Sequence, residues 1–258
     1  MLWKIDNTPH RVLGSVHILP ENVVLPTWAA ECHHGMKRFV FESDFRTQSA
    51  ATVGVDTSGA HLAFPGAADL YARAAAFLAS LGSVEPFDCL RPWRAAFYLV
   101  SRLLPHAGLS HAHGMDNRLR LYADREQFTT AFLESPTRAF DLVDSSCKQA
   151  MGGLRFFEKV LAYAISGAGL AELQRIIRAW FASDLVEFSA IHRERLAEFP
   201  FMFDPLITQR NREWVSVARS LIADKTPTLL IVGSLHTVGS GSFIEQLSDD
   251  GFRLIRVS

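Results

Sequence analysis

Six short runs of apolar and β-branched residues predict buried β-strands. Each run is bounded by glycine, proline or polar turn residues, and each is shorter than a typical helix. We expect strands at residues 3–6, 11–16, 38–41, 128–133, 228–232 and 252–257.

Longer stretches between these runs carry apolar residues at every third or fourth position. This spacing places the apolar side chains on one face of an α-helix. The clearest cases lie at residues 70–81, 97–104, 154–161 and 173–180. Helix-end signals agree with this pattern. They are Ser135 as an N-cap before Pro136, Gly82 and Gly251 as C-terminal stops, and Ser242 with Glu245 as a capping box.

Strands at both chain ends with helical stretches between them predict an α/β fold. We expect a central, mostly parallel or mixed sheet with helices on both faces and a large helical insertion. No low-complexity linker interrupts the 258 residues. The sequence therefore predicts one domain over residues 1–258, with residues 135–224 forming a helical layer within it.

Charge and cysteine content narrow the possible partners and compartments. The 26 basic and 27 acidic residues nearly cancel and form no block, which argues against nucleic acid or an anionic membrane as partner. The three cysteines lie far apart and are odd in number, as expected for free thiols in a reducing compartment. No leader pattern opens the chain, and its apolar runs fall well short of the ~20 residues of a membrane span. We expect a soluble, cytoplasmic protein.

One motif occurs near both ends of the chain. Residues 11–18 read Arg-Val-Leu-Gly-Ser-Val-His-Ile, and residues 230–237 read Leu-Ile-Val-Gly-Ser-Leu-His-Thr. Both copies predict a strand that ends in Gly-Ser-x-His, which presents His17 and His236 at the rim of the sheet. Ligands of open α/β sheets bind beyond the carboxyl ends of the strands. Glu42 ends another predicted strand, so we expect it beside the two histidines.

Two imidazoles and a carboxylate form a typical site for a divalent metal. Neutral histidine nitrogen and carboxylate oxygen suit Zn, Mn, Co or Fe and leave positions open for water and substrate. The simpler interpretation of Glu42 is a solvated carboxylate at a strand end, and that of a single Gly-x-x-His is a locally satisfied histidine. We interpret His106, His111 and His113 as incidental loop histidines, and His33, His34 and His192 as solvated residues. The stretch Gly239-Ser-Gly-Ser242 is interpreted as a plain helix start.

The order of several motifs resembles the TraB/GumN family, which includes the Tiki metalloproteases. The resemblance rests on Leu2-Trp-Lys-Ile5, Leu13 to Ile18, Phe41 to Asp44, Gly114-Met-Asp116, Leu133-Glu134, Arg210-Asn211, Val232 to Gly239 and Gly251-Phe252. It covers nearly the whole chain. It implies a fold akin to erythromycin esterase and ChaN-like (EreA/ChaN-like) proteins, with the paired Gly-x-x-His motifs and an acidic residue forming a metal-dependent hydrolytic site.

Carried over by position, the resemblance gives His17, Glu42 and His236 as catalytic and metal-binding residues, with Asp116 and Glu134 as a second tier. Arg210 and Asn211 join the catalytic set as groups that hold a substrate carboxylate or an oxyanion. Their simpler interpretation is a solvent-facing first turn of a helix. For Asp116 the alternative is a helix N-cap, and for Glu134 a solvated carboxylate.

The leading functional hypothesis is a metal-dependent hydrolase, metallopeptidase-like, that cleaves a peptide or a small amide or ester. Its cofactor would be Mn, Co or Zn, with the identity open. A metal-free version uses one histidine as general base and Arg210 as electrophile. The alternative is a non-catalytic protein that sequesters a peptide or a metal, as in pheromone shutdown. The partner is a peptide or small-molecule substrate, and the pattern leaves the oligomeric state unassigned.

Overall fold

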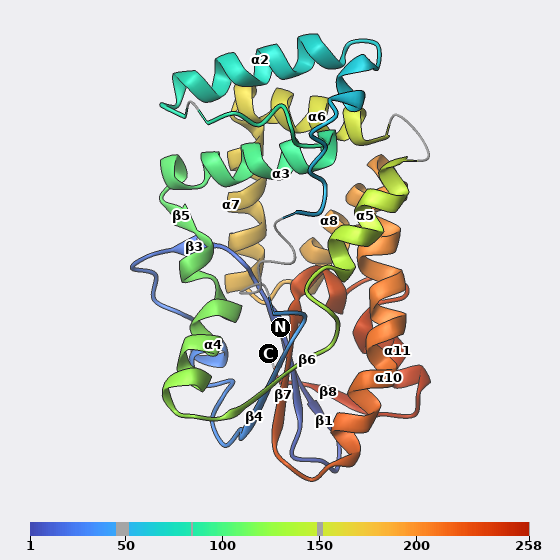
Figure 1. Cartoon of the computed structure of the whole chain (residues 1–258). Helices are drawn as coiled ribbons and strands as arrows, with labels where there is room; N and C mark the ends of the chain where they lie inside the picture. The colour runs from blue at the N-terminus through green and yellow to red at the C-terminus, as the bar shows by residue number, and fades with distance from the viewer. Residues whose placement is uncertain (45–51, 84, 149–151, 258) are drawn as a thin grey trace. The chain divides into compact units, whose positions relative to one another are not determined.

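The computed structural model describes residues 1–44, 52–83, 85–148 and 152–257 (Figure 1). These residues fall into two compact units. The first comprises residues 1–44, 110–136 and 176–257, and the second comprises residues 52–83, 85–109, 137–148 and 152–175. The expectation of one domain stays a prediction.

A six-stranded mixed sheet forms the centre of the first unit (Figure 1). Its order is β6-β4-β7-β2-β1-β8. Strands β6, β4, β7 and β2 run parallel, whereas β1 is antiparallel to both β2 and β8. All six predicted strands and the α/β class are confirmed. The bounds are β1 (Leu2–Ile5), β2 (Arg11–Ser15), β4 (Arg38–Phe41), β6 (Thr129–Phe132), β7 (Thr228–Gly233) and β8 (Leu254–Arg256).

The register of the parallel strands sets where the sheet presents its carboxyl ends. Ser15 of β2 pairs with Gly233 of β7, and Val40 of β4 pairs with Leu230 of β7. Every residue of β4 and β7 is buried, as expected for central strands covered on both faces. The ends of β2, β4 and β7 therefore lie next to one another at one edge.

Helices cover the sheet of the first unit on both sides, with α4 on one side and α10 and α11 on the other (Figure 1). The fully buried side chains of Phe39, Trp180, Trp214 and Phe243 belong to the core between sheet and helices. The helices are α1 (Thr27–Ala30), α4 (Met115–Arg125), α8 (Leu185–Glu198), α9 (Pro200–Phe203) and α10 (Arg210–Ala223), followed by α11 (Phe243–Asp249). Shorter elements are β3 (Leu19–Pro20), the 3₁₀ turns η4 (His111–His113) and η6 (Ser234–Thr237), and a π-helical turn at Asp204–Gln209.

The second unit is built around helices whose aromatic and leucine side chains form a separate core. Trp93 and Phe157 are fully buried in it. The Trp93 indole donates to Asp144, which also pairs with Arg91. Helix α7 begins here and continues into the first unit, and β5 (Leu109–Ser110) lies at the boundary in the chain. The helices are α2 (Ala67–Ser80), α3 (Pro92–Leu103), α5 (Arg138–Lys148), α6 (Gly152–Ser166) and α7 (Ala168–Phe181), with 3₁₀ turns at Ala60–Ala63 and Pro105–Ala107.

Most of the expected helix ends are confirmed. Gly82 (φ +78°) and Gly251 (φ +94°) follow α2 and α11 in the left-handed region that favours glycine. The Ser242 hydroxyl accepts the Glu245 N–H at 3.2 Å and caps α11. The expected cap at Ser135 is wrong, because α5 begins only at Arg138. Across the described part of residues 135–224, every regular element is helical.

Among the described residues, no single helix has the length and apolarity to cross a membrane. The consecutive segments Gly153–Ser166 and Ala168–Phe181 meet those criteria only as a pair, and they are bent by 90° at their junction.

Candidate functional site

His17, Glu42 and His236 come together around Gly233, the last residue of β7. His17 follows β2, Glu42 follows β4 directly, and His236 lies in η6 directly after β7. A Cβ atom placed on Gly233 would lie 3.0 Å from His17 Nε2, 3.2 Å from Glu42 Oε1 and 3.6 Å from His236 Cδ2. The side-chain atoms of all three predicted residues thus face one small volume. Glycine at this position keeps it open.

Glu42 is a buried carboxylate with both oxygens engaged. Oε1 accepts the Gly233 N–H at 2.6 Å, and Oε2 accepts Arg210 Nη2 at 2.7 Å. Burial alone would raise the pKa of Glu42. The Arg210 guanidinium, the two imidazoles and the Gly233 N–H outweigh burial and lower the pKa well below its usual range. Glu42 is therefore ionised, and the solvated interpretation is wrong, since the residue is 8% exposed.

Arg210 connects two carboxylates inside the protein. Its Nε donates to Glu134 at 3.0 and 3.1 Å, and its Nη2 donates to Glu42 and Glu134, both at 2.7 Å. Its Nη1 donates to the Leu206 carbonyl at 3.1 Å. Trp214 lies under the guanidinium and donates its indole N–H to Glu134 at 2.9 Å. All three nitrogens of Arg210 are thus occupied by protein groups, as expected for an internal counter-ion.

His236 is buried and held by an amide. Its Nδ1 lies 2.6 Å from Asn211 Oδ1, and its ring centroid lies 4.5 Å from that of Trp214. Nε2 is 3.3 Å from Arg210 Nη1. Because Asn211 Oδ1 only accepts, Nδ1 carries the proton and Nε2 offers its lone pair to the guanidinium. Burial, reinforced by the nearby cations, lowers the pKa of His236 to about 3 despite the Glu42 charge. His236 is therefore a neutral imidazole.

His17 has the opposite character, because 47% of its side chain is exposed and its partner is charged. Its Nδ1 lies 3.2 Å from Asp116 Oδ2. Partial burial opposes protonation, but Asp116 and then Glu42 outweigh it and raise the pKa of His17 to about 9. The backbone at His17 is anchored as well. The His111 ring nitrogen Nδ1 lies 3.2 Å from the His17 carbonyl oxygen, and the Met115 N–H donates to the Val16 carbonyl at 2.8 Å. His17 is therefore an exposed, mostly protonated imidazole with a fixed orientation.

A cavity of about 30 Å³ opens beside His17 and Glu42. Polar side chains dominate its lining, and three of them, Ser15, Ser43 and Arg120, were not among the predicted site residues. The lining residues are Ser15, His17, Phe41, Glu42, Ser43, Asp116, Arg120 and Ile231.

Several sequence-based alternatives are wrong, because tertiary contacts bury the residues concerned or engage their side chains elsewhere. Asp116 is not an N-cap: Gly114 takes that position in α4, and Asp116 binds His17 instead. The Glu134 side chain is only 4% exposed, so it is not solvated. Arg210 and Asn211 open α10 as expected, but both are buried rather than solvent-facing.

His192 is also buried, at 3% exposure, and packs against Gly239. Its interpretation as a solvated residue is therefore wrong. His111 of the discounted run contacts the His17 carbonyl, so it has a local structural partner. The expected helix start after Gly239 is confirmed by α11.

Four residues of the site were not among the predicted site residues. Ser15 lies two positions before His17, Ser43 directly follows Glu42, Arg120 lies one helical turn after Asp116, and Trp214 lies one turn after Arg210. A carboxylate or guanidinium predicted for a helix face has its neighbours at the third and fourth positions along that face. This spacing was the available signal for Arg120 and Trp214.

The donor set as placed does not fit a bound divalent cation. Glu42 has both oxygens occupied, and a guanidinium stands 3.3 Å from His236 Nε2, the nitrogen that would ligate. Within the described residues, no group of three His, Cys, Asp or Glu side chains is arranged to hold a metal. A cation at this point would have to displace Arg210 from Glu42.

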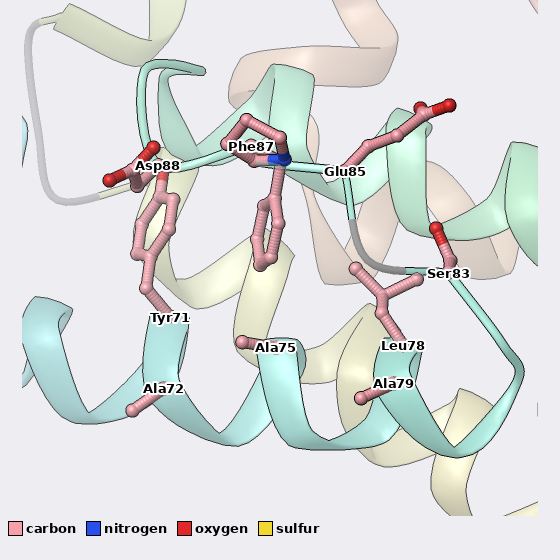
Figure 2. A pocket seen from close by; sticks show the side chains of 10 residues that line it. Tyr71, Ala72, Ala75, Leu78, Ala79, Ser83, Glu85, Phe87 and Asp88 are labelled. Atoms are coloured by element: carbon pink, nitrogen blue, oxygen red, sulfur yellow. The ribbon is translucent and has the colours of Figure 1, made fainter.

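A second, larger cavity lies within the second unit. It has a volume of about 460 Å³ and lies between α2 and residues 83 and 85–88. Figure 2 shows Tyr71, Leu78 and Phe87 facing this space, whereas the Glu85 carboxylate points away from α2. Glu85 pairs with Arg102 and Tyr98. The lining is mainly apolar and brings no titratable cluster together.

Comparison with known proteins places the whole chain in one family. No curated protein and no solved structure matches it. Residues 1–256, which include both Gly-Ser-x-His strand ends and Glu42, match the TraB/PrgY/gumN family, and the chain therefore belongs to that family.

Proposed function

We propose that this protein is a hydrolase that cleaves a peptide, or a small amide or ester, beside His17 and Glu42. The observation that carries the proposal is the convergence of His17, Glu42 and His236 on Gly233, with His17 alone of the three substantially exposed. Such an arrangement joins an accessible acid–base group to a fixed buried charge, and it is suited to general acid–base hydrolysis.

His17 is the group suited to move protons. Asp116 holds Nδ1, which leaves Nε2 facing the small volume at Gly233. In its neutral form His17 takes a proton from water as the water attacks the carbonyl carbon, and the imidazolium then protonates the leaving group. The Asp116 carboxylate stabilises that imidazolium and keeps the ring oriented.

Glu42 and His236 supply a fixed electrostatic environment. Glu42 stays ionised between Arg210 and the Gly233 N–H, and its charge favours the cationic form of His17. His236 is neutral and, through Asn211 and Arg210, fixes the position of the guanidinium. Arg210 is thereby a counter-ion for Glu42 rather than the electrophile that the metal-free version invoked, because its nitrogens are already occupied.

The requirement for Mn, Co or Zn stays a prediction. No step of the chemistry above passes through a cation, since Arg210 occupies the carboxylate that a cation would need. The protein's near-neutral charge and its three free cysteines support a peptide or small-molecule substrate in a reducing compartment, so we also propose a cytoplasmic location.

Turnover tests this proposal against sequestration. Metal-stripped protein, and protein supplied with Mn²⁺, Co²⁺ or Zn²⁺, is incubated with a peptide and ester panel at substrate excess, and products are identified by mass spectrometry. We expect product well beyond the protein concentration, lost in His17→Asn and Glu42→Gln and retained in the loop control His106→Asn. Saturable loss of ligand without product would establish a binder instead. Activity only with added metal would replace the general-base mechanism.

A further inference from the structure

The cavity beside His17 contains buried polar atoms that have no hydrogen-bond partner in the described part of the chain. The hydroxyls of Ser15 and Ser43, in residues 2% and 3% exposed, have no hydrogen-bond partner among the described residues, and neither does Asp116 Oδ1. All three residues line the cavity. Because buried polar groups nearly always have partners, three such atoms at one place indicate a site built for a polar ligand.

Arg120 adds a positive charge to the same cavity. It lies one helical turn after Asp116 on α4, and its side chain is 18% exposed. Among the described residues its guanidinium makes two long contacts, a hydrogen bond of 3.3 Å to Asn117 Oδ1 and an ion pair of 3.5 Å with Asp44 Oδ1. The guanidinium therefore retains donors for a ligand in the cavity.

The balance of charge and size favours a carboxylate. The two acidic side chains in the lining are already paired, Glu42 with Arg210 and Asp116 with His17. The groups that remain available to a ligand are the two serine hydroxyls and the Arg120 guanidinium. This set of hydrogen-bond donors matches a carboxylate. A cavity needs roughly 10–15 Å³ for each water-sized group, so about 30 Å³ admits a planar carboxylate more readily than a tetrahedral phosphate.

We propose that this cavity binds the free α-carboxylate of the substrate, held by Arg120, Ser15 and Ser43. The inference deepens the proposed hydrolysis and rests on it for the substrate's role. The unpartnered Asp116 Oδ1 favours an α-carboxylate over an acidic side chain as the group that binds in the cavity. An N-acylated carboxy-terminal residue carries an N–H next to its α-carboxylate, and that N–H supplies the donor that Asp116 Oδ1 lacks. The enzyme then removes or trims residues at a carboxyl terminus.

Binding tests the site without relying on turnover. N-acetyl-L-alanine and its amide are titrated into the full-length protein, with affinity measured by calorimetry. We expect the free acid to bind at least about ten times more tightly than the amide, because the amide cannot form the charge-assisted, bidentate hydrogen bond with the Arg120 guanidinium. Arg120→Gln and Ser43→Ala should weaken binding of the acid by a similar factor. Arg125→Gln on the same helix and Ser220→Ala on α10 serve as matched controls. Equal affinities for acid and amide, or unchanged affinity in Arg120→Gln with the fold intact, overturn the proposal.

Kinetics separates this inference from the proposed function. Peptides are compared as free acids, as carboxy-terminal amides, and as amides with an internal Asp or Asn. We expect kcat/KM to favour the free acid, and Arg120→Gln to remove that preference mainly through KM. Hydrolysis with no preference would refute the carboxylate site and leave the hydrolase standing. Selective binding of the acid without any hydrolysis would refute the hydrolase and leave the site standing. Preference for internal Asp over Asn would replace the α-carboxylate by a side-chain carboxylate and overturn the proposal as stated.

Discussion

The two Gly-Ser-x-His strand ends have the same local sequence but opposite environments. His17 is half-exposed, pairs with the Asp116 carboxylate and has its pKa raised to about 9. His236 is buried, pairs with the neutral Asn211 amide and has its pKa lowered to about 3. The repeated motif therefore determines where each imidazole lies, whereas the partner on another element determines its charge. One histidine is suited to proton transfer and the other to holding the site together.

The most direct test of the difference between the two histidines is to remove His17, the proton-transfer group. We expect His17→Ala to lower kcat by about 10²–10⁴-fold, the usual contribution of general acid–base catalysis. The melting temperature should change little, because a half-exposed side chain contributes little to the core. Steady-state kinetics and thermal unfolding of the same preparation give both values. Wild-type kcat in this variant would remove His17 from the mechanism.

Removing the buried histidine should instead affect stability. His236→Ala leaves Asn211 Oδ1 and an Arg210 N–H without partners and opens a cavity beside Trp214. We expect a loss of about 2–4 kcal/mol in the free energy of unfolding. Urea unfolding followed by circular dichroism measures it. Equal stability of wild type and variant would show that His236 is not a structural member of the network.

The pH dependence of kcat/KM tests whether Asp116 raises the pKa of His17. If neutral His17 is the base, kcat/KM should rise with pH and level off near about 9, the raised pKa of His17. Asp116→Asn removes the main charge that raises this pKa, so the pH at which kcat/KM levels off should fall toward the ordinary value near 6.5. NMR titration of the His17 ring supplies the pKa directly. A wild-type plateau already near 6.5 with added metal would indicate a bound cation, because a cation competes with the proton for the ring nitrogen.

The smallest expected effect is the contribution of His17 to the pH dependence of stability, and its sign is opposite to that of the His236 contribution. The raised pKa of His17 stabilises the fold fully below about 6.5, and this contribution is lost as pH rises through about 9. Because the side chain is half-exposed, solvent screening limits it to about 1 kcal/mol or less. The lowered pKa of His236 acts in the other direction, so stability falls as pH drops from 6.5 toward about 3. Unfolding of wild type and Asp116→Asn at pH 7 and 9.5 checks the first sign. A wild type that gains stability over that range relative to the variant would contradict it.

Local pattern was sufficient to predict the strands and the positions of the three central residues. Burial of β4 and β7 on both faces requires continuous apolar runs, and these runs are visible without any knowledge of their neighbours. Strand direction then places the residues that follow β2, β4 and β7 at one edge, as observed for His17, Glu42 and His236. The start of α5 was misplaced because Ser-Pro is a helix signal only when the following turn is helical.

The sequence by itself determined the α/β sheet, the two histidine-bearing strand ends and the carboxylate between them, because hydrophobic periodicity and strand-end placement are local properties. The tertiary structure alone decided the charge of each group. Arg210 reaches Glu42 across 168 residues of sequence, and Asp116 reaches His17 across 99. Protonation and metal affinity depend on burial and on charges within a few ångströms, and folding brings those charges together from distant parts of the chain.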